Sequence, residues 1–177
     1  MFVVGHASGL IAVLEKQMES HRKSALALTQ QHEKLKVALA LIIGVKGIAQ
    51  ASAVQILAEL MILLGDMTAK QWVAHAGLDP RHVGSGSSVA KKPRISKAGN
   101  KCIRQALYMP ALVAANHEPN AKGYYRHLIG GNGLKKIQAI CAVMRKLLHA
   151  IHGMLKINKE FDGARFYTLS AQKYPDF

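Results

Sequence analysis

A seam of ten positions, spaced three and four residues apart, runs from Ile11 to Ile42, and no glycine or proline interrupts it. Such spacing over more than four heptads is the pattern of a coiled-coil helix. The seam predicts one long helix over residues 1–43 that pairs with another copy of the chain. Its members are Ile11, Leu14, Met18, His21, Ala25, Leu28, His32, Leu35, Leu39 and Ile42.

The two histidines of the seam, His21 and His32, allow two interpretations. The simpler one is that they are polar register markers in a weak coiled coil. The other is a pH switch or a metal pair, which needs a third ligand that the sequence does not place.

The remainder of the chain also has a helical pattern. Ala, Leu, Lys and Gln outnumber Val, Ile and Thr, and no long stretch alternates apolar with polar residues. We therefore predict an all-α fold: a helical bundle over residues 44–158, with a long N-terminal coiled-coil helix, a basic Gly/Ser loop and an aperiodic tail over 159–177. Helices are expected at 52–64, from a Thr68-x-x-Gln71 capping box, from Gly99 to a kink or stop near Pro110, at 121–128 and at 134–157.

The segment Gly44-Val-Lys-Gly-Ile-Ala-Gln separates two of these helices. It resembles the hairpin of a helix-hairpin-helix motif, whose amides can hold a phosphate. Ala49 stands where that motif has its second glycine, so an ordinary helical turn is at least as good an interpretation.

Residues 78–98 have no periodicity and form the most basic part of the chain. Residues 78–104 contain seven basic residues and one acid, Asp79. Glycines in the loop let backbone amides approach phosphate oxygens, and the cations add salt-dependent affinity. We predict nucleic-acid binding by Arg81, Gly84, Gly86, Ser87, Ser88, Lys91, Lys92, Arg94, Lys97, Lys101 and Arg104. If these residues do not bind, the alternative footprint is Lys135, Lys136, Arg145 and Lys146.

Composition supports this choice of partner. The 177 residues include 24 Lys and Arg against 10 Asp and Glu, which gives a net charge of +14 and a pI near 10.0. Such a surface attracts polyanions. The apolar runs are too short for a bilayer span, and the two cysteines, Cys102 and Cys141, form no paired motif, so a cytoplasmic protein is expected. Cys141 lies on a helical apolar stripe and is expected to be a small buried hydrophobe.

The sequence contains no Ser-His-Asp spacing that implies contact and no acids paired at a metal-ligand spacing, so no metal site is predicted within the chain. Two other classes stay open on the residues alone. One is a helical DNA- or RNA-binding module without catalysis, and the other is a coiled-coil assembly factor whose charge only keeps it soluble.

Five motifs in a fixed order add a resemblance to a known family. They are Trp72-Val-Ala-His-Ala-Gly-Leu-Asp-Pro-Arg, Ser85-Gly-Ser-Ser, Ile95-Ser-Lys-Ala-Gly-Asn, Arg104-Gln-Ala-Leu-Tyr-Met-Pro-Ala and Met144-Arg-Lys-Leu-Leu. Residues 44–158 resemble the C-terminal transposase domain of the insertion-sequence one-ten family, which includes Piv-type invertases and bridge-RNA-guided recombinases. The seam is similar to the coiled coil that in this family precedes that domain and mediates dimerisation.

The resemblance implies that Ser85 is the nucleophilic serine of DNA transposition or site-specific recombination, on the ends of an insertion element and its target. In the guided members a guide RNA is a further partner. It also implies that Mg²⁺ is bound by four acids of an N-terminal RuvC-like domain, so that we expect the chain to begin after that domain. This chain would then hold no cofactor and would cleave no strand alone.

Overall fold

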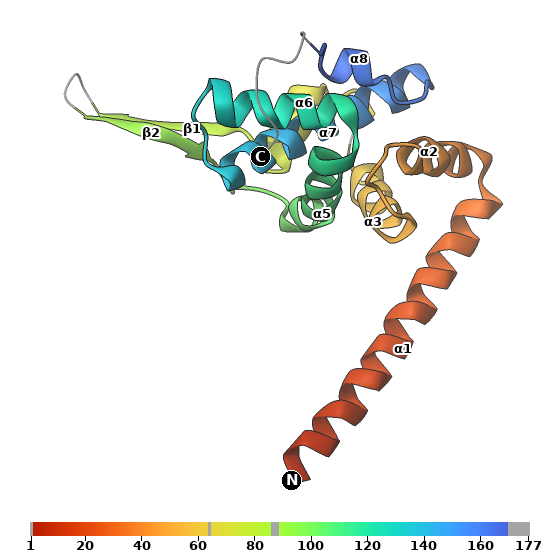
Figure 1. Ribbon diagram of the computed structural model, residues 1–177. Coiled ribbons are helices and arrows are strands. Elements are labelled where there is room, and N and C mark those ends of the chain that lie inside the picture. The colour runs from red at the N-terminus through yellow and green to blue at the C-terminus, as the bar shows by residue number, and fades with distance from the viewer. Residues whose placement is uncertain (1, 64, 86–88, 170–177) are drawn as a thin grey trace.

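The computed structural model describes the backbone of residues 2–63, 65–85 and 89–169, and their side chains except those of 2–6 and 82–93. Helices dominate, which confirms the predicted all-α class, and one two-stranded sheet projects from them (Figure 1). The elements are α1 (Phe2–Gln31), α2 (Glu33–Ile43), α3 (Gln50–Met61), α4 (Ala69–His75), β1 (Pro80–Ser85), β2 (Val89–Ile95), α5 (Lys101–His117), α6 (Pro119–Arg126), the π-helical turn η1 (His127–Gly131), α7 (Lys136–Ile157) and α8 (Gly163–Phe166).

Helices α5 and α7 form the centre of the core, and α2, α3, α4 and α6 pack around them. The apolar stripe predicted on α7 is buried from Ile140 to Met154 except at the half-buried Cys141, whereas Ile137 at its start is exposed. Leu147 and Ile151 are fully enclosed. Helix α5 does not stop at Pro110 but continues to His117. Pro110 itself is buried in the core. The Thr68–Gln71 capping box at the start of α4 is confirmed.

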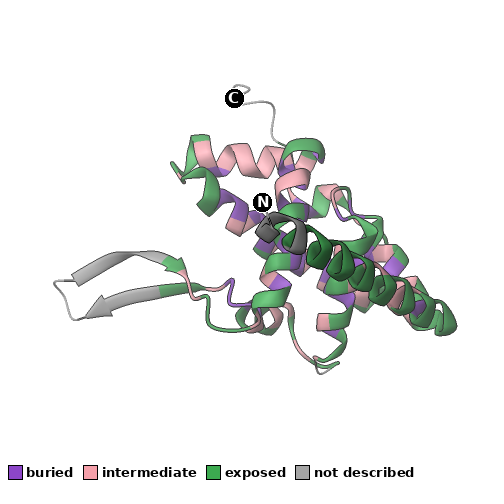
Figure 2. Cartoon of the chain, turned by 90° about the horizontal axis from the view of Figure 1, so that it is seen from below, coloured by how far each residue is buried: buried purple, intermediate pink, exposed green. Residues whose placement is uncertain are grey.

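The expected single helix over residues 1–43 is interrupted at His32. This residue has extended backbone angles (φ −122°, ψ 110°), so α1 ends and α2 begins there. Leu39 and Ile42 of the seam are buried in the core, whereas Ile11, Leu14, Met18 and Leu28 are exposed on α1. Figure 1 shows α1 extending away from the helical body, and Figure 2 shows its surface largely exposed. The two halves of the seam therefore have different surroundings.

The turn between α2 and α3 lies directly on α5. Gly47 has φ 109°, and a Cβ there would come within 2.9 Å of the Ala114 amide nitrogen and 3.0 Å of the Pro110 carbonyl oxygen. Val45 and Ile48 on either side of it are buried. The turn is thus used for packing between helices, which is the ordinary interpretation of this segment.

Residues 80–95, expected as an irregular loop, form the antiparallel hairpin β1–β2. The pairing runs from Pro80 opposite Ile95 to Ser85 opposite Val89, and residues 86–88 between the strands lie outside the described residues. Its register shifts between Arg81 and Val83, where β2 has one extra residue and contains a proline, which cannot donate to a strand ladder. A two-stranded hairpin alone is at best marginally stable, so its attachment to the helices matters.

Hydrogen bonds between the two ends of the hairpin form its attachment. Ser96 donates from its amide to the Asp79 carbonyl at 2.9 Å and from its hydroxyl to the Asp79 carboxylate at 2.6 Å. The Lys97 amide donates to the Gly77 carbonyl at 3.0 Å. These bonds hold the chain entering the hairpin against the chain leaving it.

The segment after the hairpin then packs on the end of α4. The Asn100 amide donates to the His75 carbonyl at 2.7 Å, and a Cβ on Gly99, where φ is 126°, would collide with the same oxygen. The Asn100 side chain accepts from two amides in the first turn of α5 and donates to Glu59 of α3 at 2.6 Å. A single asparagine therefore links α3, α4 and the start of α5.

Arg104 completes this attachment. Its Nη1 donates to the Ala76 carbonyl at 2.8 Å and to the Gly99 and Asn100 carbonyls at 3.3 Å each. We use the name hairpin root for Asp79, Ser96, Gly99, Asn100 and Arg104.

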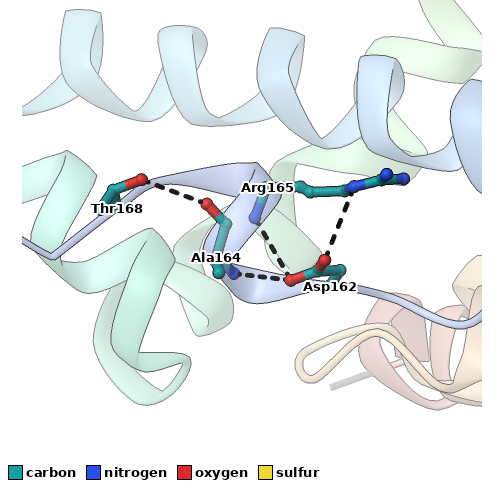
Figure 3. Close-up of polar contacts among 4 residues, drawn as sticks. All are labelled: Asp162, Ala164, Arg165 and Thr168. Carbon is teal, nitrogen blue, oxygen red and sulfur yellow. Dashed lines mark hydrogen bonds and ion pairs between the residues drawn. The ribbon is translucent and has the colours of Figure 1, made fainter.

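Part of the expected tail also has a defined place. Asp162 caps α8 by accepting from the Ala164 and Arg165 amides at 2.9 and 3.3 Å, and Thr168 returns to the Ala164 carbonyl (Figure 3). Phe166 is buried, and the Lys146 ammonium of α7 lies 4.2 Å from the ring centre of Tyr124 and near the Phe166 ring. Residues 159–169 therefore cover the core beside α6 and α7.

We predict that Arg104→Ala lowers the free energy of unfolding by about 1–3 kcal/mol, because it removes a charged donor from three backbone carbonyls. Lys101→Ala is the matched control, since Lys101 is an exposed cation one turn earlier on α5. We expect the control to stay within about 0.5 kcal/mol of the wild type. Urea unfolding followed by circular dichroism measures both, and equal midpoints for the two variants would refute a structural role for Arg104.

Candidate nucleic-acid interface

The predicted basic residues gather on one projection of the molecule. Arg81, Arg94 and Lys97 are exposed at the base of the hairpin, and Lys101 is exposed on the first turn of α5. Lys91 and Lys92 belong to β2, and Gly84 and Ser85 are the last residues of β1. Figure 1 shows β1 and β2 extending away from the helical body.

Some of the predicted site residues do not join this surface. Gly86, Ser87 and Ser88 lie outside the described residues. Arg104 is half-buried, and its guanidinium donates to carbonyls of the hairpin root. The described contacts of Arg104 are those of a residue that holds the backbone.

Acidic residues are scarce in this part of the chain. Asp79 is the one acid between residues 78 and 104, and its carboxylate accepts from Ser96. The ion pairs reported for the described residues involve Glu19, Glu33 and Asp162, all distant in sequence from the hairpin. A protruding hairpin that is rich in cations and poor in acids can enter a groove of a nucleic acid and contact its phosphates.

A second basic element lies beside the base of the hairpin. A cleft of about 610 Å³ separates the hairpin base from the first half of α7, and Arg145 of α7 lines it together with Arg94 and Lys97. The sequence named Arg145 only within a separate footprint, because 48 residues separate it from Lys97. Neither the hydrophobic periodicity nor the composition of the sequence indicated that the hairpin base and α7 lie side by side.

The lysine next to Arg145 has different surroundings. Burial lowers the pKa of Lys146, whose ammonium lies over the Tyr124 ring. Lys146 is thus partly withdrawn from the surface on which Arg145 lies.

Two further ionisable groups on α7 are shifted by burial. Burial raises the pKa of the Cys141 thiol, and the nearby Lys97 partly offsets that effect. Burial, followed by the positive charge of Arg145 and other neighbouring cations, lowers the pKa of His149. Cys141 is only half-buried, since it lines the cleft, so the expectation of a buried hydrophobe holds in part.

Metal binding can be tested on the same residues. Within the described part of the chain, no group of three or more His, Cys, Asp or Glu side chains is placed to hold a metal ion. His21 and His32 therefore gain no third ligand there. The described residues do not fit a magnesium site.

The described helices include none that is both long and apolar enough to cross a bilayer.

Comparison with known proteins gives this surface a context. The chain is 36% identical over 110 residues to the pilin gene-inverting protein of Moraxella lacunata, which covers 60% of this chain and 34% of that protein. The Moraxella bovis protein of the same name matches to the same extent. The insertion element IS110 uncharacterized 43.6 kDa protein of Streptomyces coelicolor is 28% identical over 103 residues, or 56% of this chain and 25% of that protein.

The matched part thus spans about a third of the length of the two pilin gene-inverting proteins. Residues 39–126 match the model of the transposase IS116/IS110/IS902 family, and this range runs from α2 through the hairpin to the end of α6. Residues 39–126 of the chain are therefore similar to the transposase domain of the IS116/IS110/IS902 family.

Proposed function

We propose that this chain is the DNA-binding, serine-bearing part of an enzyme of DNA transposition or site-specific recombination. The observation that carries the proposal is the basic hairpin, which projects from within the transposase domain and presents Ser85 as the last residue of β1. The relatives support it, since two of them are named for inverting a gene and one for an insertion element. The partner is DNA, bound through its phosphates by the cations of the hairpin.

In this proposal the Ser85 hydroxyl oxygen attacks a phosphorus atom of the DNA backbone. A serine O–P bond forms, the bond from phosphorus to the 3′ oxygen breaks, and a 5′-phosphoserine and a free 3′ hydroxyl result. The serine loses one proton and the 3′ oxygen gains one, so that no net proton or electron is exchanged. Cations near the phosphate stabilise the charge that develops in the transition state.

A serine hydroxyl is a weak nucleophile unless a base or a metal ion assists it. We propose that this assistance comes from a magnesium-binding, RuvC-like domain in cis or on another subunit, because the described residues do not fit a metal site. The chain described here would contribute the nucleophile and the phosphate contacts.

The first prediction concerns DNA affinity. If about five hairpin cations contact phosphates, the logarithm of the binding constant for duplex DNA should fall with the logarithm of salt at a slope of about −4.5. Replacing Lys91, Lys92, Arg94 and Lys97 by alanine should flatten the slope to about −1. Fluorescence anisotropy over a series of salt concentrations measures the slope. A structured RNA serves as the second probe.

The matched control replaces Lys16, Lys23, Lys34 and Lys36 of α1 and α2 by alanine, because these exposed residues carry the same total charge far from the hairpin. Its slope should equal that of the wild type. Equal flattening in both variants would mean that net charge, and not the hairpin, determines binding.

The second prediction concerns Ser85. The isolated chain, with Mg²⁺ and DNA, should form no covalent adduct, whereas adding a RuvC-like domain should yield one. Ser85→Ala should abolish the adduct, and the neighbouring Ser87→Ala and Ser88→Ala should retain it. Denaturing gels with labelled DNA separate adduct from free strand.

Loss of the adduct in Ser87→Ala alone would place the nucleophile two residues later. An adduct absent from every mixture, with DNA binding intact, would favour a non-catalytic DNA-binding module. Cleavage by the isolated chain would refute the need for a second domain.

We also propose that α1 joins copies of the chain, because Ile11, Leu14, Met18 and Leu28 leave a long apolar stripe in water. Leu14→Asp with Leu28→Asp should give monomers in sedimentation velocity runs. Ala12→Asp with Gln30→Asp is the control, since helical spacing puts both on the opposite side of α1. A wild type that stays monomeric at high concentration would contradict this proposal.

A further inference from the structure

The cleft beside the hairpin base has an apolar interior and a basic rim. Ile95 and Ile137 contribute apolar surface from β2 and α7, and Leu134 adds more from the turn before α7. Arg94, Lys97 and Arg145 lie around it, and each is exposed. The three cations come from two segments that meet only in the folded chain.

Ile137 is unusual among the stripe residues of α7. The stripe is buried from Ile140 onward, yet Ile137 is 54% exposed and faces the cleft. A large aliphatic side chain gains little by standing in water, and apolar surface next to several cations commonly marks a binding site.

Lys97 has a backbone conformation that fits a special role. Its φ of 53° lies in the left-handed region, which non-glycine residues seldom adopt. The hydrogen bond from its amide to the Gly77 carbonyl holds this conformation. Its positive charge partly offsets the rise in the pKa of the Cys141 thiol, which lies in the cleft. Backbone conformations of this kind concentrate at binding and catalytic sites.

We infer that this cleft holds one unpaired nucleotide of a bound DNA strand, with its base on Ile137 and its phosphate among Arg94, Lys97 and Arg145. In duplex DNA the faces of the bases are stacked on one another, so an apolar floor can contact a base face only where the strand is unpaired. Guanidinium planes also stack on bases. This inference rests on the proposed function, because an unpaired nucleotide next to a break is what a recombining strand presents.

The two cysteines provide a direct probe. In a Cys102→Ser background, Cys141 is the one remaining thiol, and it lies in the cleft. We expect a duplex with a short single-stranded overhang to slow its alkylation by a maleimide, and a blunt duplex with the same number of phosphates to leave the rate unchanged. Equal rates with both duplexes would overturn the inference, and so would protection by a single-stranded RNA that exceeds the protection by DNA.

Variants separate the cleft from the rest of the interface. Ile137→Ala should weaken binding of the overhang duplex relative to the blunt one by about fivefold, near the lower limit for losing one base contact. Ile157→Ala is the control, because Ile157 is similarly exposed, at 48%, at the other end of α7. Arg145→Gln should lower the preference for the overhang, whereas Lys156→Gln at the far end of α7 should not.

The outcome also distinguishes this inference from the function on which it rests. Steep salt dependence with the blunt duplex, together with no preference for the overhang, would refute the cleft and leave the DNA-binding proposal standing. Weak binding of both duplexes with shallow salt dependence would refute the DNA-binding proposal itself.

Discussion

The carbonyl groups at the end of α4 determine how the basic surface is presented. Those of His75 and Ala76 accept from Asn100 and Arg104, which belong to the segment that follows the hairpin. A helix ends with carbonyls that lack a partner within it, and here the partners are donors from another part of the chain. These hydrogen bonds therefore fix the base of the hairpin to the helical body. The same hydrogen bonds join the segment after the hairpin to the end of α4.

This arrangement explains why the family resemblance extends beyond the residues that can touch DNA. Gly99 and Asn100 belong to one of the five motifs and Arg104 begins another, and all three act on the backbone of the root. Arg81, Arg94 and Lys97 at the base of the hairpin differ from these three residues, because their side chains are exposed. The base of the hairpin thus combines residues that hold the backbone with exposed cations.

The sequence predicted those features that rest on local periodicity. The stripe of α7, the capping box at Thr68 and the helical class follow from spacing within a single segment, and the structure confirms them. The hairpin was missed because residues 80–95 show no regular alternation of apolar and polar residues and contain several glycines and serines, so they resembled a loop. The break at His32 was missed because the apolar spacing of the seam continues through it. Seam residues on α1 such as Ile11 are exposed, whereas Leu39 and Ile42 on α2 are buried in the core. The cleft joins residues distant in sequence, and no local pattern reports such a contact.

The projection of α1 away from the helical body sets a length scale for an assembly. Its 30 residues correspond to a rod of about 45 Å, which equals about 13 base pairs of DNA. If two rods pair in parallel, both helical bodies lie at one end, and two hairpins can act on the same stretch of duplex. If they pair in antiparallel fashion, the bodies lie at opposite ends and the hairpins reach two separate duplexes. The polarity of one helix pair would then decide whether the assembly handles one DNA segment or brings two together.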